Sequence, residues 1–168
     1  MTNWSRRQVL AVSAILPITL SGCLGDDAAD DTADDVPPDD IPARIHTFLR
    51  HARLYDETIT DARGEDEVEV IVGAGQQGFA YDPVALRVDV GTTVEWVWSG
   101  TGGGHDVVST GGSDFSFESE RTREAGTTFS YTFDDGGVAL YECRPHRTQG
   151  MLGAVDVMFP DDTVSDDH

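Results

Sequence analysis

The sequence predicts an all-β domain, a β-sandwich of seven to eight strands, in the part of the chain that follows Gly64. In that part, apolar residues alternate with polar ones at a period of two, which is the pattern of a strand with one buried face. Glycine, proline and aspartate separate the alternating runs, and these residues favour turns. Short strands with turns at this spacing are typical of a β-sandwich.

The first 22 residues predict an export signal of the twin-arginine type. Arg6 and Arg7 precede a mostly apolar run, Val9–Leu20, which is shorter than the about 20 residues that a membrane-spanning helix needs. The stretch Ser5-Arg6-Arg7 resembles signals that export folded proteins. The alternative is a buried N-terminal helix, but Pro17 and the arginine pair suit a signal better.

Cys23 ends a stretch, LSGC, that resembles a lipobox, so we expect cleavage before Cys23 and a lipid on its thiol. Residues 23–40 are acidic with almost no apolar content, which predicts a disordered linker. The mature protein is then expected on the extracytoplasmic face of the cell membrane, held by its lipid anchor. With Cys23 lipidated, Cys143 has no disulfide partner, and a metal is the natural reason for its thiol.

The charge of the chain limits its partners. There are 31 acidic residues against 11 basic ones, a formal net charge of −20, and every basic residue is an arginine. This composition is typical of a halophile, whose acidic surface keeps the protein hydrated while salt screens the repulsion. The alternative is an ordinary acidic protein with its charge in the tails. Nucleic acid is excluded as a partner because the chain has no basic stripe.

Residues 41–63 predict an amphipathic helical segment that precedes the sandwich. Apolar residues recur there at spacings of three and four, from Ile41 through Ile45 to Tyr55, and this spacing predicts about four helical turns. His46 and His51 lie in the same segment. We expect both on a solvated polar face, in preference to a metal site.

The domain is expected to span residues 64–160, with an acidic tail at 161–168. The alternating residues that predict its strands are Val68, Val70 and Val72; Leu86, Val88 and Val90; Val94, Trp96 and Trp98; Phe115 and Phe117; Phe129, Tyr131 and Phe133; Val138 to Cys143; and Ala154 to Phe159. Large aromatic side chains dominate core burial. We therefore expect Trp96, Trp98 and Tyr141 to be core residues and not redox relays.

Four residues of two loops carry the chemistry. A glycine run delivers His105, and the stretch YECRPHRTQGM places Cys143, His146 and Met151 within nine residues. Each of these alone is more often a structural residue: a surface histidine, a small buried thiol or core filler. Together they supply two imidazoles, a thiolate and a thioether, the ligand set of an electron-transfer copper with a weak axial methionine.

These motifs give the chain a clear resemblance. The block from about Glu67 to Phe159 resembles a cupredoxin of the plastocyanin class, and the chain as a whole is similar to the halocyanins, small blue copper proteins of halophilic archaea. The resemblance implies a cupredoxin-like Greek-key sandwich and one copper ion held by His105, Cys143, His146 and Met151. It also implies that His146 presents its edge to solvent and passes the electron.

Asp106 is a departure from the pattern of this class, which usually has asparagine after the first histidine to tie the two ligand loops together. An ionised carboxylate has no N–H to donate. The link must therefore run through acceptance alone, or the group must be protonated. We also expect its charge to favour Cu(II) and lower the midpoint potential.

The predicted function is that of a blue copper protein, a monomer and not an enzyme, which carries one electron at a time between membrane-associated redox proteins as copper cycles between Cu(I) and Cu(II). A catalytic copper oxidase or reductase would place histidines beside the cysteine, where this chain has Glu142 and Arg144. Copper storage and a zinc-binding, non-redox β-sandwich also have to be considered. Methionine, however, is a poor zinc ligand.

Overall fold

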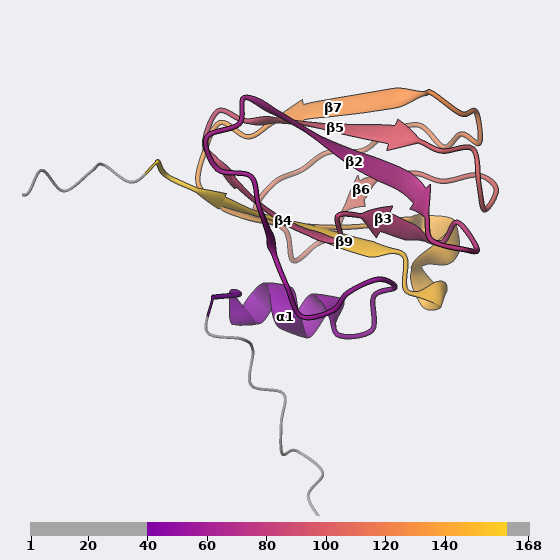
Figure 1. The fold of residues 1–168 in the computed structure, drawn as a ribbon, viewed down its shortest axis with the longest axis horizontal. Coiled ribbons are helices and arrows are strands. Elements are labelled where there is room, and N and C mark those ends of the chain that lie inside the picture. Colours follow the sequence, from indigo (N-terminus) through magenta and orange to yellow (C-terminus); the bar gives the residue numbers. More distant parts are fainter. Residues whose placement is uncertain (1–39, 161–168) are drawn as a thin grey trace, which may run out of the picture. The chain divides into compact units, whose positions relative to one another are not determined.

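The computed structural model describes residues 40–160. Two β-sheets pack face to face in this part of the chain (Figure 1). One sheet has the strand order β3 (Ala80–Asp82), β2 (Glu67–Ala74), β5 (Thr93–Trp98) and β7 (Thr128–Thr132). The other has the order β1 (Thr60–Asp61), β4 (Ala85–Asp89), β9 (Leu152–Met158), β8 (Gly137–Glu142) and β6 (Val108–Ser109). The predicted all-β sandwich is confirmed.

The strands follow the alternation in the sequence. In β5, Val94, Trp96 and Trp98 are buried while the residues between them are partly exposed. β5 runs parallel to β2 and antiparallel to β7, so that Trp96 lies between Val70 and Phe129. Because successive side chains of a strand point to opposite faces, this register directs one apolar face of each strand inward.

The main core fills the space between the two sheets. Trp96 and Tyr141 are fully buried, Trp98 is 2% exposed, and all three belong to one apolar cluster, as the sequence predicts. The rings of Trp96 and Tyr141 meet edge to face, with centroids 5.4 Å apart. Such aromatic contacts add to the free energy of area burial. This core provides a stiff base beneath the loops at one end of the sandwich.

The helix is shorter than the sequence suggests. α1 spans Ala43–Leu49, about two turns instead of four, and Leu54 and Glu57 have positive φ angles that end any helical path. The Asp56 carboxylate accepts hydrogen bonds from the Thr58 amide and hydroxyl, a local turn that competes with helix. After this turn, β1 pairs in parallel with β4.

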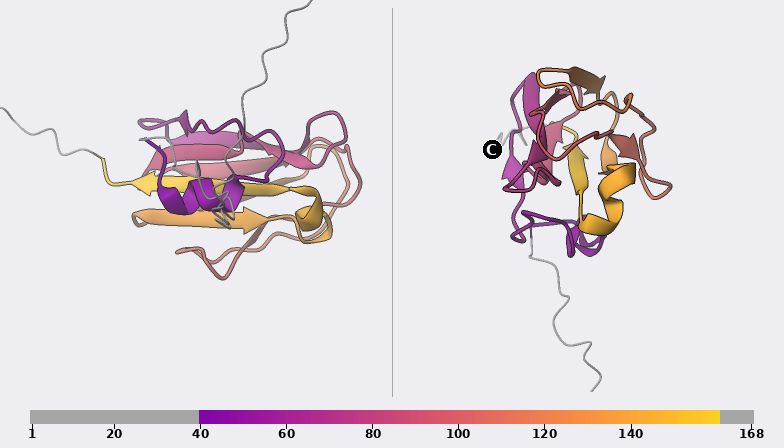
Figure 2. Two further views of the ribbon diagram at one scale, coloured as in Figure 1. Left: turned by 90° about the horizontal axis from the view of Figure 1, so that it is seen from below. Right: turned by 90° about the vertical axis from the view of Figure 1, so that its right-hand side faces the viewer.

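The apolar stripe was nevertheless a correct guide to burial. α1 lies along the five-stranded sheet, across β8 and β9 (Figure 2). Its buried side chains form a second apolar cluster with residues of that sheet. The members of this cluster are Ile41, Ile45, Leu49, Val84, Ala85, Leu140 and Ala154, with Phe48, Ala52, Tyr55 and Ile59 packed against them.

The expectation for His46 was wrong, because His46 is 3% exposed and its Nδ1 lies 3.2 Å from the Tyr55 hydroxyl. A turn that folds back after α1 carries Tyr55 to this position, which a regular helix from Ile41 to Tyr55 would not do. His51 is exposed, as expected. Neither histidine lies in the metal-binding cluster described below.

Two short strands, β1 and β3, were missed because two or three residues carry no readable alternation. Conversely, Phe115 and Phe117 predict a strand but lie in an irregular segment that touches the sheet through single bridges and loop hydrogen bonds. Both rings pack on the core, where Phe117 is 7% exposed. The alternation of aromatic residues here correctly indicates that the rings are buried, although the backbone does not form the continuous hydrogen bonds of a β-strand.

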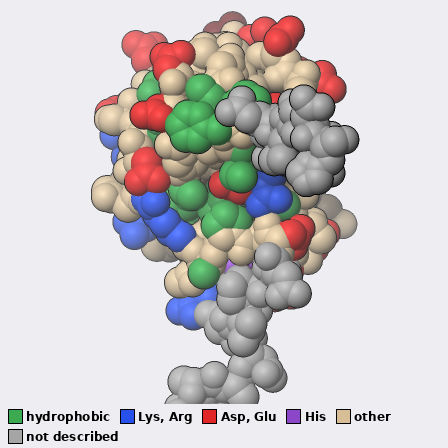
Figure 3. Space-filling view, turned by 90° about the vertical axis from the view of Figure 1, so that its left-hand side faces the viewer, with side chains coloured by type: hydrophobic (Ala, Val, Ile, Leu, Met, Phe, Trp, Pro, Cys, Tyr) green, Lys and Arg blue, Asp and Glu red, His purple; other side chains and the backbone are tan. Residues whose placement is uncertain are grey.

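At the end of the sandwich opposite the 3₁₀ helix, Arg144–Gln149, the face of the described part carries hydrophobic, basic and acidic side chains. Acidic side chains lie around the rim of that face (Figure 3), and Glu65, Asp66, Asp134 and Asp135 are all exposed. Among residues 40–160, no helix is long and apolar enough to cross a bilayer. The predicted signal, Cys23, the linker up to residue 39 and the acidic tail at 161–168 lie outside the described residues.

Candidate metal centre

His105 enters the site from a glycine-rich loop between β5 and β6. Its backbone exchanges two hydrogen bonds with Thr122, at 2.8 and 3.0 Å, and its carbonyl accepts a third from the Trp98 indole N–H. Its Nε2 lies 2.7 Å from the Thr101 carbonyl oxygen, which can only accept. Nε2 must therefore carry the proton, and Nδ1 is left with a free lone pair that points towards Cys143.

A glycine makes room for this arrangement. A side chain at Gly73 would place its Cβ 2.6 Å from the Thr101 carbonyl oxygen and 3.3 Å from His105 Nε2. Gly73 also has φ +86°, a conformation that other residues rarely adopt. Strand β2 can thus end directly against the carbonyl that orients the His105 ring.

The other three predicted residues lie on the connection between β8 and β9. Cys143 follows β8, and His146 lies in the 3₁₀ helix that ends at Gly150, whose φ is +84°. Met151 precedes β9 and is fully buried. The Met151 amide donates to the His146 carbonyl at 3.2 Å, and the Cys143 amide donates to the Met151 carbonyl at 3.0 Å. The main chain of Met151 is therefore hydrogen-bonded to both other residues.

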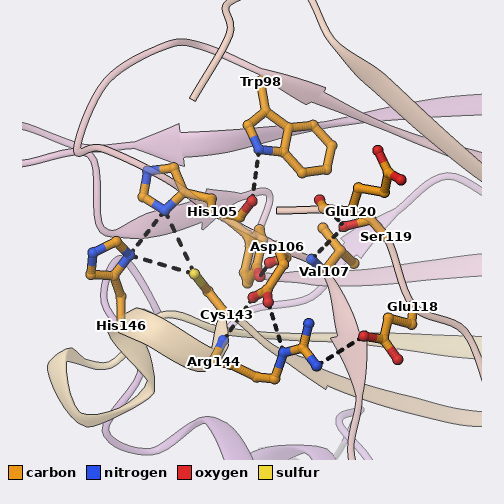
Figure 4. A network of polar contacts seen from close by, with 11 residues as sticks. Trp98, His105, Asp106, Val107, Glu118, Ser119, Glu120, Cys143, Arg144 and His146 are labelled. Carbon is orange, nitrogen blue, oxygen red and sulfur yellow. Dashed lines mark hydrogen bonds and ion pairs between the residues drawn. The ribbon is translucent and has the colours of Figure 1, made fainter. Parts of the chain in front are cut away.

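Side chains from the two loops converge on one point (Figure 4). Cys143 Sγ lies 3.6 Å from His105 Nδ1 and 3.5 Å from His146 Nδ1, and the two Nδ1 atoms are 3.0 Å apart. All three donor atoms fall within 4.8 Å of one another. His105 and Cys143 are fully buried, whereas His146 is half-buried.

The protonation of these groups suits a metal. Burial lowers the pKa of His105 and of His146, so both imidazoles favour the neutral form that has a lone pair. Burial raises the pKa of the Cys143 thiol to about 11, although backbone N–H groups of Asp106 and His146 act in the opposite direction. A cation is therefore needed to hold the buried thiolate, and its binding releases the thiol proton.

Asp106 links the two loops through acceptance alone, one of the two possibilities that the sequence leaves open. It is 1% exposed. Its Oδ1 accepts the Arg144 amide N–H at 2.8 Å, and its Oδ2 accepts the Arg144 guanidinium at 2.7 Å. Arg144 also pairs with the exposed Glu118 at 2.8 Å, and Asp106 raises the pKa of Arg144. The residue after Cys143 thus neutralises the residue after His105.

Three residues around the site were not predicted from the sequence. Arg144 is the partner of Asp106. The sequence shows a charged residue next to Cys143 but does not show which carboxylate that residue contacts. The Phe79 ring lies 4.5 Å from the His146 ring, and the Arg53 guanidinium lies over the Phe79 ring, 6.0 Å from its centroid. Phe79 precedes β3, and Arg53 follows α1, so neither is near His146 in the sequence.

The residues present fit a copper ion. Two imidazole nitrogens and a buried sulfur meet at metal-binding separations, and the outward nitrogen of His105 is hydrogen-bonded to a backbone carbonyl, as is usual for histidines that bind metals. The set of two histidines and one cysteine, with a buried methionine beside it, is characteristic of electron-transfer copper sites.

Comparison with known proteins points in the same direction. Residues 68–158 match the model of the copper binding proteins, plastocyanin/azurin family. Halocyanin from Natronomonas pharaonis is 56% identical over 156 residues, which cover 90% of this chain and 96% of that protein. The chloroplastic plastocyanin of Pisum sativum is 33% identical over 99 residues, 54% of this chain and 58% of that protein.

Among solved structures, pseudoazurin from Methylobacterium extorquens is 30% identical to this chain, with a TM-score of 0.46. The match covers 58% of this chain and 79% of the pseudoazurin chain.

Proposed function

Because the chain belongs to the plastocyanin/azurin family of copper-binding proteins, we propose that it is a blue copper protein that carries single electrons between redox proteins. The observation that carries the proposal is the convergence of His105 Nδ1, Cys143 Sγ and His146 Nδ1 within 4.8 Å. Copper bound there supplies a one-electron couple between Cu(II) and Cu(I).

The proposed ligands have distinct roles. His105, Cys143 and His146 provide the strong donors, and Met151 provides a weak fourth donor from its buried position. Thiolate and thioether suit Cu(I), whereas imidazole also suits Cu(II), so one ligand set serves both states. Zinc is disfavoured because a structural zinc site takes a fourth strong ligand, which methionine is not.

The frame supports fast electron exchange by holding the donors still. His105 is fixed by hydrogen bonds to Thr101, Thr122 and Trp98, and Asp106 with Arg144 ties its loop to that of Cys143. When the donor atoms keep their positions as the copper gains an electron, little energy is spent on reorganising the site, and the transfer is faster. Burial of Cys143 and Met151 also suits copper retention, in contrast to the exposed ligands of a metal store.

A catalytic role has little support in the described part of the chain. The cluster of His105, Cys143 and His146 is the one metal-binding group found among residues 40–160. The remaining histidines in that range, His46 and His51, lie on or after α1. We assign the site to electron transfer because of the donor set that it presents.

His146 is the proposed point of electron exit. It is half-buried, whereas His105 and Cys143 are fully buried. Next to it lie Phe79 and a shallow pocket that Leu54 helps to line, and Leu54 is 53% exposed. The pocket is lined by apolar side chains together with Arg53 and two glutamines, and such a mixed surface suits contact with a redox partner at the imidazole edge.

The proposal is tested by electrochemistry. The mature domain, loaded with Cu(II) in high salt, should show an intense blue absorption, should lose it on addition of one electron per copper, and should give a reversible one-electron voltammogram. Zinc-loaded protein is the control and should stay colourless. A colourless oxidised copper protein, or irreversible voltammetry, would refute the assignment.

We further propose that the protein works at the extracytoplasmic face of the cell membrane, tethered through a lipid on Cys23, and meets membrane-associated partners there. The support is the sequence of residues 1–40, in which one stretch resembles a twin-arginine signal, a second resembles a lipobox and the rest is acidic. The expected result of Cys23→Ala in the native host is that the protein moves from the membrane fraction to the medium. Continued membrane association of that variant would contradict the tether.

A further inference from the structure

The loop that carries Met151 is held from outside by a segment that precedes the family match. The match begins at residue 68, but Arg53 contacts the connection between β8 and β9 twice. Its backbone N–H donates to the Gly150 carbonyl at 2.8 Å, and its guanidinium Nε donates to the Gln149 carbonyl at 2.7 Å. These are the last two carbonyls before Met151.

These carbonyls belong to a crowded, left-handed turn. The 3₁₀ helix ends at Gly150 with φ +84°, and carbonyls at a helix end need partners from elsewhere. A Cβ at Gly150 would lie 2.6 Å from the His51 carbonyl oxygen and 3.3 Å from the Arg53 nitrogen. The segment 51–53 is therefore packed directly against the turn, so that a movement of either displaces the other.

The segment that holds the turn is itself anchored at both ends. Before it, Ile45 and Leu49 of α1 are fully buried against the five-stranded sheet. After it, β1 pairs with β4, Thr60 opposite Leu86. Arg53 thus projects from a fixed piece of backbone, which is what an outer contact needs if it is to fix a ligand loop.

The position of this turn affects the positions of the metal donors. The Met151 amide and carbonyl are hydrogen-bonded to His146 and Cys143 respectively. A displacement of Gln149 and Gly150 would therefore move the thioether and loosen both of these contacts. We propose that Arg53 is a positioning residue of the copper centre, which sets the placement of Met151 through the Gln149 and Gly150 carbonyls; this inference rests on the proposed function.

A pair of variants separates the hydrogen bond from the bulk of the side chain. Arg53→Met keeps an unbranched side chain out to the position of Nε but has no donor, whereas Arg53→Gln places an amide N–H where the arginine has Nε. We expect Arg53→Met to lower Cu(I) affinity by about tenfold, the lower end of what outer contacts contribute. It should also change the intensity ratio of the two visible copper–thiolate bands, and Arg53→Gln should restore both properties.

The control is Arg44→Met. Arg44 lies on α1 and also joins it to the domain, but through Asp114 at 2.7 Å and the Gly112 carbonyl, away from the ligand loop. It should leave the Cu(I) affinity and the band ratio unchanged. Equal effects of Arg44→Met and Arg53→Met would mean that a general loosening of α1 is responsible, and would overturn the proposal.

A measurement on metal-free protein makes the inference independent of copper. Hydrogen exchange of the Gly150 and Met151 amides, followed by NMR, should be faster in Arg53→Met than in the unchanged protein, and Arg53→Gln should exchange at the original rate. Unchanged exchange and unchanged affinity in Arg53→Met would refute the positioning role. Failure of the unchanged protein to turn blue would instead refute the proposed function.

Discussion

Replacing Cys143 with serine is expected to abolish the blue absorption of the copper-loaded protein. The colour of such a site arises from a copper–thiolate bond, and a hydroxyl provides neither the soft sulfur that Cu(I) prefers nor that transition. Because Cys143 donates directly at the point where His105 and His146 meet, the loss of affinity should exceed the about 10–100-fold that removal of an outer contact costs. Absorption spectra and Cu(I) competition with a coloured chelator measure both effects.

The fold should survive this change. Serine is close in shape to cysteine, and an unpaired hydroxyl at this fully buried position costs about 1–3 kcal/mol of unfolding free energy. Circular dichroism of the metal-free variant should therefore match that of the unchanged protein. Cys23→Ser provides the matched control, since it removes the other thiol and should leave the colour intact. A blue Cys143→Ser protein would rule out the proposed ligand set.

Opposite shifts of the midpoint potential are expected from the two partners of the loop-joining ion pair. Asp106→Asn keeps an oxygen that can accept from the Arg144 amide but removes a negative charge, which destabilises Cu(II) relative to Cu(I) and raises the potential. A unit charge within about 10 Å at an effective dielectric of about 20 contributes about 1–2 kcal/mol. That is about 40–90 mV for one electron.

Arg144→Gln should lower the potential, because it leaves the nearly inaccessible Asp106 carboxylate without its guanidinium partner. The double variant should return towards the original value, as expected for coupled charges. Glu118→Gln is the control, since Glu118 is 60% exposed and pairs with the outward side of Arg144, so its shift should be small. Shifts of the same sign in Asp106→Asn and Arg144→Gln would show that altered geometry, and not charge, governs the potential.

The prediction of the site from the sequence depended mainly on the spacing of the metal-binding residues along the chain. Three of the four donors lie between Cys143 and Met151, and a connection that short, between two adjacent strands, leaves few ways to arrange them. His105 was found by its type and its glycine run. The roles of Arg144, Arg53 and Phe79 were not found, because they depend on how distant segments approach, and no local pattern records such an approach.

The fold was predicted where burial and periodicity coincide, and the prediction failed where they separate. β2 and β5 are long enough for alternation to be legible. The apolar stripe from Ile41 to Tyr55 correctly predicted which side chains are buried. The second half of the expected helix is instead a turn that folds back and packs on the domain. This turn places Tyr55 against His46, which is therefore buried. Helical spacing reports which side chains face the core, and several backbone paths satisfy the same spacing.

The separation of His105 and Cys143 along the chain, 38 residues, has a bearing on how the molecule withstands unfolding. An ion shared by both would act as a cross-link that closes a long loop, much as a disulfide does. In a chain-entropy picture, a loop of this size reduces the freedom of the denatured chain by about 4 kcal/mol. A bound metal would then also stabilise the folded state as a cross-link. The described residues contain no disulfide, so the metal would take the stabilising role that disulfides commonly have in secreted domains.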